Sequence, residues 1–160
     1  MKIRVGLGYD VHELRKDHPF WIGGVQLDHH SGAYGHSDAD VLLHAICDAI
    51  LGALSLRDIG HHFPDTSADF AGIDSKILLS QVVDLMREKG FEVGNIDSTV
   101  CLEKPKVNPY IPEMQNVIAG ICGIEFDDVS IKATTSEKMG YVGREEGVFA
   151  QAVVLLQSGK

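Results

Sequence analysis

"HSDADVLLHAICDAI", residues 36–50, is the stretch that most strongly predicts the fold. Apolar side chains fill most faces of the segment that follows Asp38, which is typical of a largely buried helix. Ser37 or Asp38 is a suitable N-cap, because a short polar side chain there accepts a hydrogen bond from a free backbone N–H. We therefore expect a helix from Asp38 to about Leu54.

Three polar side chains interrupt this apolar helix. Asp40, His44 and Asp48 are spaced one turn apart, so they share one face. Burying them without partners would cost roughly 2–7 kcal/mol each. One interpretation is a core histidine held by Asp40 or Asp48, and the other is a histidine that binds a metal ion. The spacing alone leaves both interpretations open.

A second Asp and His pair occurs in "YDVHEL", residues 9–14. Asp10 and His12 are two positions apart near the end of a predicted strand, so their side chains point to the same face. Together with His44 they offer two nitrogens and one oxygen, a set that suits a catalytic Zn²⁺ and leaves a fourth position for substrate. A carboxylate one turn from His44 would then orient its ring through the other N–H.

The remaining segments predict an α+β fold. We expect strands over residues 3–11, 92–103, 128–136 and 147–157, a hairpin over 20–27, and helices from Asp74 to Gly90 and over 111–123. Residues 58–72, rich in Gly, Pro and Asp, predict a long loop. Strands and helices alternate irregularly without a repeat or linker. We therefore expect one compact domain, residues 1–160, with helices on one face of a mixed sheet.

Composition and charge exclude several classes of protein. Hydrophobic residues make up 44% of the chain, and no apolar run approaches the roughly 18 residues of a membrane helix. The net charge of −9 argues against a nucleic-acid partner, and it means that a polyanionic ligand would need metal ions or a local basic cluster. Three cysteines without C-x-x-C spacing, and no leader-like N-terminus, predict a cytoplasmic location.

Other polar segments admit two interpretations each. In residues 131–138, "IKATTSEK", the hydroxyls would suit phosphate oxygens and Glu137 a hard cation such as Mg²⁺, or the segment is simply a polar loop. "KPKVNP", residues 104–109, would present backbone groups and Lys106 to a ligand, or it only connects elements. His36 lies before a helix N-terminus, where an anion is favoured. Arg144 lies among glycines and is either functional or merely exposed.

Taken together, five motifs resemble one enzyme family. They are "GYDVH", "GHSDADVLLHA", "DIGHHFPDT", "PKVNPYIPEM" and "IKATTSEKMGYVGREEG". They occur in the order and at the spacing of the 2-C-methyl-D-erythritol 2,4-cyclodiphosphate synthases of non-mevalonate isoprenoid biosynthesis, and the resemblance covers residues 4–156. Five ordered motifs are far more specific than any one of them, so the resemblance favours the metal site over the core histidine.

The resemblance implies the ligands of two metal ions and two catalytic residues. One Zn²⁺ per subunit would be bound by Asp10, His12 and His44. A second ion, Mg²⁺ or Mn²⁺, would be held at the diphosphate by Glu137. The implied stabilisers of the charge that develops at phosphorus are His36 and Thr135.

The implied substrate contacts are spread along the chain. Asp58 would contact the erythritol hydroxyls. The other implied positions in the first half are Ser37, Ile59, Gly60, Phe63, Pro64, Asp65, Thr66 and Ser67. The cytidine pocket would be formed by Leu102, Glu103, Lys104, Pro105, Lys106, Val107 and Asn108. The remaining positions are Thr134, Ser136, Tyr141 and Arg144.

The resemblance also implies a reaction and an assembly. The substrate would be 4-diphosphocytidyl-2-C-methyl-D-erythritol 2-phosphate, which is converted to the 2,4-cyclodiphosphate and CMP. Three subunits would form a homotrimer with active sites between neighbours. The alternatives are a zinc phosphohydrolase, which would use the open metal position to activate water, and a metal-stabilised binding protein without catalysis.

Overall fold

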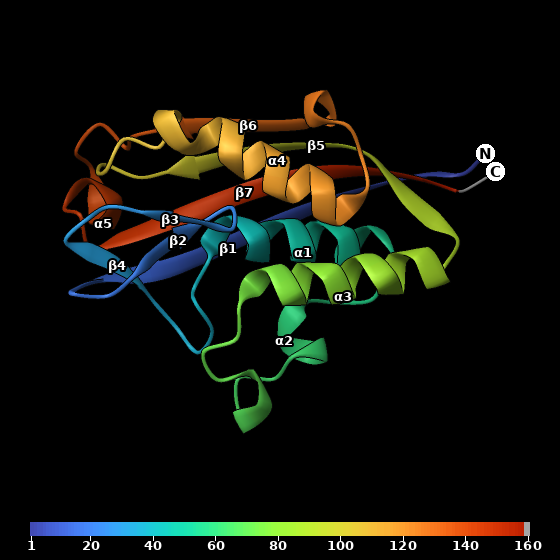
Figure 1. The fold of residues 1–160 in the computed structure, drawn as a ribbon, viewed down its shortest axis with the longest axis horizontal. Coiled ribbons are helices and arrows are strands. Elements are labelled where there is room, and N and C mark those ends of the chain that lie inside the picture. Colours follow the sequence, from blue (N-terminus) through green and yellow to red (C-terminus); the bar gives the residue numbers. More distant parts are fainter. Residues whose placement is uncertain (159–160) are drawn as a thin grey trace.

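The fold is an α+β domain built on a five-stranded mixed sheet, shown in Figure 1 for a computed structural model that describes residues 1–158. The strands are β1 (Ile3–Lys16), β4 (Ser31–Tyr34), β5 (Phe91–Cys101), β6 (Val129–Thr134) and β7 (Gly147–Ser158). Their order is β4-β1-β7-β5-β6, with β5 and β6 parallel and the other pairs antiparallel. The predicted α+β class and mixed sheet are confirmed.

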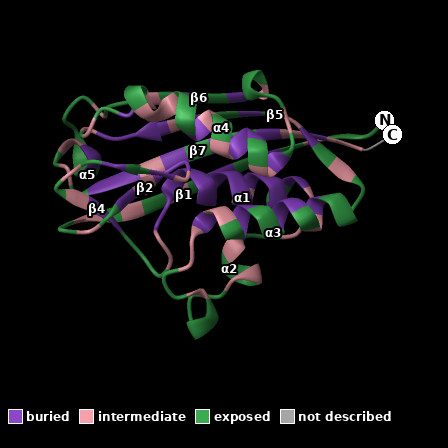
Figure 2. Ribbon diagram, viewed as in Figure 1, coloured by how far each residue is buried: buried purple, intermediate pink, exposed green. Residues whose placement is uncertain are grey.

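Three longer helices cover one face of this sheet. Helix α1 (Val41–Ala53) packs directly on β1 and β7, α3 (Ser75–Glu88) packs on α1, and α4 (Ile111–Cys122) packs near β6. Two single-turn helices, α2 (Ile59–His62) and α5 (Gly140–Gly143), lie in the connections. Figure 2 shows α1 as the most buried helix, between the sheet and α3. No helix in residues 1–158 has both the length and the apolar character needed to cross a membrane.

Several predicted boundaries differ from the structure. Helix α1 begins later than predicted, with Asp40 as its N-cap, because Asp40 has an extended backbone and accepts a hydrogen bond from the N–H of Leu43. The first strand continues beyond residue 11 to Lys16, where it pairs with β4, a short strand that was not predicted. The long loop contains α2 and a short 3-10 turn (Ala68–Phe70). Asp74 caps α3 as predicted.

A small hairpin is tied to the start of α1. Strands β2 (Phe20–Ile22) and β3 (Val25–Leu27) pair as predicted, around Gly23 and Gly24 with φ angles of 62° and 77°. The N–H groups of these glycines donate to the Asp40 carboxylate at 2.9 and 2.7 Å. Burial raises the pKa of Asp40, while these donors and Leu43 N–H act in the opposite direction. Asp40 therefore has a structural position within the core.

Two glycines set how closely α1 approaches β1. A Cβ atom added at Gly8 would lie 1.8 Å from the carbonyl oxygen of Ala45, and one added at Gly6 would lie 1.8 Å from that of Ala49. The helix backbone therefore rests on the strand backbone at these two points. Any other residue there would push α1 off the sheet, because a backbone carbonyl cannot rotate away as a side chain can.

The opposite face of β1 carries apolar side chains that no other segment of residues 1–158 covers. Val5, Leu7 and Tyr9 are 65%, 67% and 48% exposed, and they alternate with the buried Gly6 and Gly8. Ile3, Val11 and Val153 of β7 are exposed as well. A strand that is apolar on both faces is typical of one that is buried on both faces. This sheet face is therefore suited to contact with another surface.

The helix-to-strand contact predicts a large difference between two glycine substitutions. Gly8→Ala should destabilise the protein by at least about 2–3 kcal/mol, because overpacking against an immobile backbone forces the helix to move. Gly120→Ala in α4 meets no atom within 4 Å and should leave stability unchanged or raise it by up to about 1 kcal/mol. Thermal midpoints from circular dichroism at one protein concentration measure both. A Gly8→Ala midpoint equal to that of the wild type would contradict the backbone contact.

Candidate metal centre and adjoining cavities

Asp10, His12 and His44 converge at one point between β1 and α1. One donor atom from each lies within 4.8 Å of the donors of the other two. Asp10 Oδ2 is 2.9 Å from His12 Nδ1 and 3.1 Å from His44 Nδ1. The predicted trio is thus brought together by the packing of the helix on the strand. Asp10 and His12 lie well inside β1 and not near its end, because the strand is longer than predicted.

The surroundings of the trio favour a cation. Burial alone would raise the pKa of Asp10, but the imidazoles of His12 and His44 lower it below its usual value. Burial alone would lower the pKa of His44, but the Asp10 carboxylate raises it, with smaller contributions from Asp40 and Asp38. The two shifts have one cause, the close approach of the carboxylate and the imidazoles: the imidazoles favour the ionised form of Asp10, and the ionised carboxylate favours positive charge beside it.

The arrangement of the nitrogen and oxygen atoms of the trio also suits a bound metal ion. The Nδ1 atom of His12 is buried and has no hydrogen-bond partner within residues 1–158, although an Asp10 oxygen is only 2.9 Å away. A nitrogen and a carboxylate oxygen that face each other without a hydrogen bond are satisfied when both coordinate one cation. Two imidazole nitrogens and one carboxylate oxygen form a common catalytic Zn²⁺ set.

The other ring nitrogen of His44 contacts two serines. His44 Nε2 is 2.8 Å from Ser75 Oγ and 3.2 Å from Ser37 Oγ. The predicted orientation of the ring by Asp40 or Asp48 is wrong. Asp40 accepts from the hairpin and helix backbone, and Asp48 accepts from the N-terminus of α2 at 2.8 Å. Both carboxylates lie one turn from His44 along the helix, but nearby backbone donors hold them.

The trio opens into a cavity of about 410 Å³. Its other walls come from the segment before α1, from the long loop and from the start of α3. The lining residues that were predicted are Asp10, His12, His36, Ser37, His44, Ile59, Gly60, Phe63 and Asp65. His36 Nε2 lies 3.0 Å from the carbonyl oxygen of Ser67, which links the rim of the metal centre to the loop.

A second cavity of about 250 Å³ lies between the loop that follows β5 and the end of β6. Its predicted lining residues are Leu102, Glu103, Pro105, Lys106, Val107, Asn108, Thr134 and Thr135. Glu103 Oε1 accepts hydrogen bonds from the N–H groups of Ser136 and Lys138, both at 3.1 Å. The Glu103 side chain therefore holds the two loops together. The second cavity shares no lining residue with the first.

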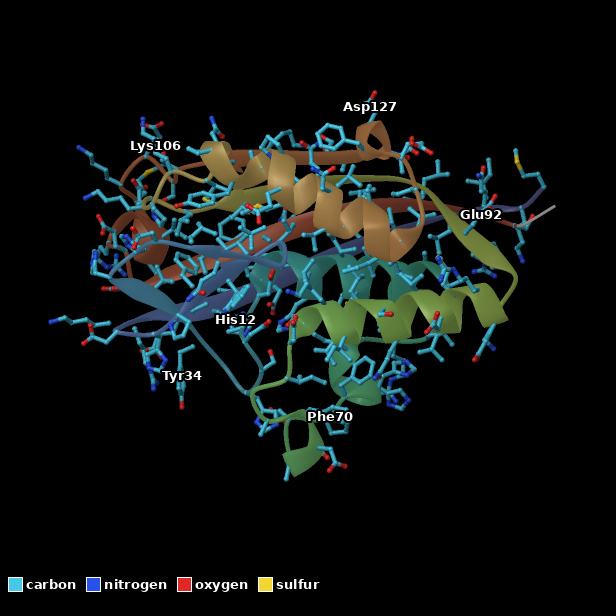
Figure 3. All side chains as sticks on the ribbon, viewed as in Figure 1. His12, Tyr34, Phe70, Glu92, Lys106 and Asp127 are labelled. Atoms are coloured by element: carbon cyan, nitrogen blue, oxygen red, sulfur yellow. The ribbon has the colours of Figure 1, made fainter. Side chains whose placement is uncertain are left out.

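The remaining predicted residues line neither of these cavities. Asp58 caps α2, Lys104 pairs with Glu145 at 3.1 Å and Arg144 pairs with Glu146 at 2.9 Å. The others outside both cavities are Pro64, Thr66, Ser67, Ser136, Glu137 and Tyr141. Figure 3 shows His12 and Lys106 well separated in the same chain. A single chain therefore does not bring the metal centre and the predicted cytidine loop into one pocket.

Sequence reasoning missed several residues around the metal centre. Ser75 touches His44, and Asp38 touches Ser75, although neither was proposed beyond an N-cap for Asp38. The cavity walls that were missed are Gly35, Phe70, Ile73 and Leu78. No local pattern marks Ser75, because it reaches His44 only when α3 packs on α1.

Comparisons with known proteins agree on one family. Residues 3–157 match the model of the YgbB family. The 2-C-methyl-D-erythritol 2,4-cyclodiphosphate synthase of Phocaeicola vulgatus is 58% identical over 160 residues, which is 100% of both chains.

Two solved structures share the fold. The bifunctional IspDF of Campylobacter jejuni superposes with a TM-score of 0.94 at 42% identity, over 98% of this chain and 42% of that longer protein. IspF of Plasmodium falciparum, solved as a CDP complex, superposes with a TM-score of 0.87 at 31% identity, over 99% and 97% of the two chains. The chain belongs to the YgbB family, the family of the 2-C-methyl-D-erythritol 2,4-cyclodiphosphate synthases.

Proposed function

We propose that this chain converts 4-diphosphocytidyl-2-C-methyl-D-erythritol 2-phosphate to 2-C-methyl-D-erythritol 2,4-cyclodiphosphate and CMP. The observation that carries the proposal is the convergence of Asp10, His12 and His44 at the wall of a cavity of about 410 Å³. The names of the family members identify the product, and the CDP complex of the Plasmodium falciparum protein identifies a cytidine diphosphate ligand in a relative.

The reaction is an intramolecular phosphoryl transfer. An oxygen of the 2-phosphate attacks the β-phosphorus and forms a new P–O bond. The bond from the β-phosphorus to the bridging oxygen breaks, and CMP leaves with that electron pair on its phosphate. The attacking phosphate is already ionised near neutral pH, so no protein nucleophile or strong base is required. Positioning and charge neutralisation supply most of the catalysis.

The residues of the first cavity have distinct proposed roles. Asp10, His12 and His44 would hold a Zn²⁺ ion, which when bound supplies a Lewis acid for the phosphate oxygens. His36, on the rim of the cavity, stabilises the negative charge that develops at phosphorus. Ile59 and Phe63 form apolar walls that exclude water from the reacting groups.

The second cavity is proposed to bind the cytidine diphosphate end of the substrate. Backbone groups of residues 102–108 would contact the base, and Thr135 would donate to a phosphate oxygen. The exposed Glu137 carboxylate, two residues further along the chain, would hold Mg²⁺ or Mn²⁺ at the diphosphate. Two divalent ions would allow a chain of net charge −9 to bind this polyanion.

A homotrimer is proposed to bring the two cavities together. The exposed apolar face of β1 and β7 supports burial against other subunits, and the separation of the cavities in one chain supports sites between subunits. The three cysteines are free and buried, which supports the proposed cytoplasmic location.

Incubation of the zinc- and magnesium-loaded protein with the proposed substrate tests the function. We expect the cyclic diphosphate and CMP in equal amounts, measured by phosphorus NMR. His44→Ala should lose bound zinc and lower turnover by at least about 100-fold, the scale of a major electrostatic contact. The control His30→Ala, at an exposed histidine outside the trio, should keep both. Open-chain hydrolysis products would instead identify a zinc phosphohydrolase, and no turnover a binding protein.

A complementation experiment tests the shared site. Asp10→Ala damages the metal half and Lys106→Glu damages the loop half, so each homotrimer should be inactive. Mixed trimers contain some interfaces with two intact halves, and activity should rise above that of both parents after subunit exchange. Native mass spectrometry monitors the exchange. Complete exchange without any recovery of activity would show that each site lies within one chain.

A further inference from the structure

His44, Ser75 and Asp38 form a hydrogen-bonded chain that runs from His44 away from the metal centre. His44 Nε2 is 2.8 Å from Ser75 Oγ, and Ser75 Oγ donates to Asp38 Oδ1 at 2.5 Å. The backbone N–H of Ser75 donates to Asp38 Oδ2 at 2.9 Å. Ser75 is fully buried at the first position of α3, so these contacts join α3 to the residues before α1 and to the metal centre.

Counting the protons in this chain gives one consistent arrangement. The Asp38 carboxylate is an acceptor only, so the single Ser75 hydroxyl proton points to Asp38. Ser75 Oγ can then only accept from His44, which places the single N–H proton of a neutral imidazole, the form that binds a metal ion, on Nε2. His44 Nδ1 is left with a free lone pair, and this is the nitrogen that faces Asp10 and His12. A lone pair facing a carboxylate oxygen at 3.1 Å is stabilised by a cation between them.

We propose that Asp38 and Ser75 are positioning residues that fix the tautomer and ring orientation of His44, so that Nδ1 is its metal-binding nitrogen. The inference rests on the metal centre of the proposed function and adds the groups that prepare one of its ligands. A hydrogen bond to the second nitrogen of a ligating histidine also raises its basicity and strengthens metal binding.

Ser37 has a weaker part in this arrangement. Its hydroxyl oxygen accepts from the N–H of Ala39 at 3.2 Å and lies 3.2 Å from His44 Nε2, farther than Ser75. A proton donated from Ser37 to Nε2 would require the opposite tautomer and would leave Ser75 Oγ facing a lone pair at 2.8 Å. Ser37 Oγ is therefore a second, weaker acceptor for the N–H at Nε2, and the proton stays on Nε2.

Separate backbone hydrogen bonds hold one end of the long loop against the metal centre. The N–H of Asp38 donates to Ile73 O at 3.1 Å, and Gly72 N–H donates to His36 O at 2.7 Å. The segment that carries His36 is therefore attached to the end of the long loop by two backbone hydrogen bonds. Loss of the Ser75 hydroxyl keeps these backbone bonds, so its effect should be confined to His44.

Zinc affinity measured by competition with a chelator tests the role of Ser75. Ser75→Ala should weaken zinc binding about 10- to 100-fold, the range found when a hydrogen-bond partner of a ligand is removed. Ser98→Ala is the matched control, because Ser98 is also buried and donates to Ser130 O at 2.9 Å, away from the trio. Its zinc affinity should equal that of the wild type. Equal zinc affinity in folded Ser75→Ala would overturn the proposal.

The tautomer itself can be read in the unmodified protein. Long-range proton–nitrogen NMR of zinc-loaded protein labelled at histidine should show His44 protonated at Nε2 and bound through Nδ1. Asp38→Asn should disturb this state, because an amide cannot accept at both positions of the carboxylate. Zinc bound through Nε2 of His44 in the wild type would overturn the proposal while leaving the metal centre intact. Failure of the wild type to bind zinc would instead refute the metal centre.

Discussion

The direct contact between the backbones of α1 and β1 is the constraint on which the rest of this structure depends. Ala45 O lies over Gly8 and Ala49 O over Gly6, so four helical residues, a rise of about 6 Å, match two strand residues of about 6.7 Å. Asp10 lies two residues beyond Gly8, and His44 immediately precedes Ala45. The packing that forms the core therefore also brings carboxylate and imidazole together.

The buried polar groups form two separate networks around the start of α1. The Asp40 carboxylate accepts backbone N–H groups from the hairpin and from its own helix, and within residues 1–158 it has no hydrogen bond to the side chains of the trio. Asp38 and Ser75 form the second network, which ends at His44. Two aspartates separated by one residue thus have different partners. Ala39, between them, has a left-handed φ of 57°, so the backbone is not a regular strand there and the two side chains do not share one face.

Much of the fold follows from local patterns in the sequence. The apolar run after Asp38 predicts α1, Gly23-Gly24 predicts the hairpin, and Asp74 predicts the cap of α3, as the structure has them. Strand β4 could not be predicted from "SGAY", because four small or mixed residues carry no alternation and the strand exists only through pairing with β1.

The candidate site is predictable only in part for the same reason. The spacing of Asp10 and His12 and the polar stripe at His44 identify possible ligands, and tertiary packing brings them together. Ser75 is separated from His44 by 31 residues, so only the packing of α3 on α1 reveals it. Of the residues expected from the family, those that line a cavity fall into two separate cavities of the single chain, and the others line neither. No local sequence pattern contains this division.

The central claim is that the contact of α1 with β1 creates a zinc site. Crystals of the zinc-loaded protein, measured on both sides of the zinc absorption edge, test it most directly. We predict one anomalous peak per subunit, at about 2.0–2.2 Å from an Asp10 oxygen and from one nitrogen each of His12 and His44. A fully loaded protein whose zinc peak lies elsewhere, with these three side chains free of metal, would contradict the claim.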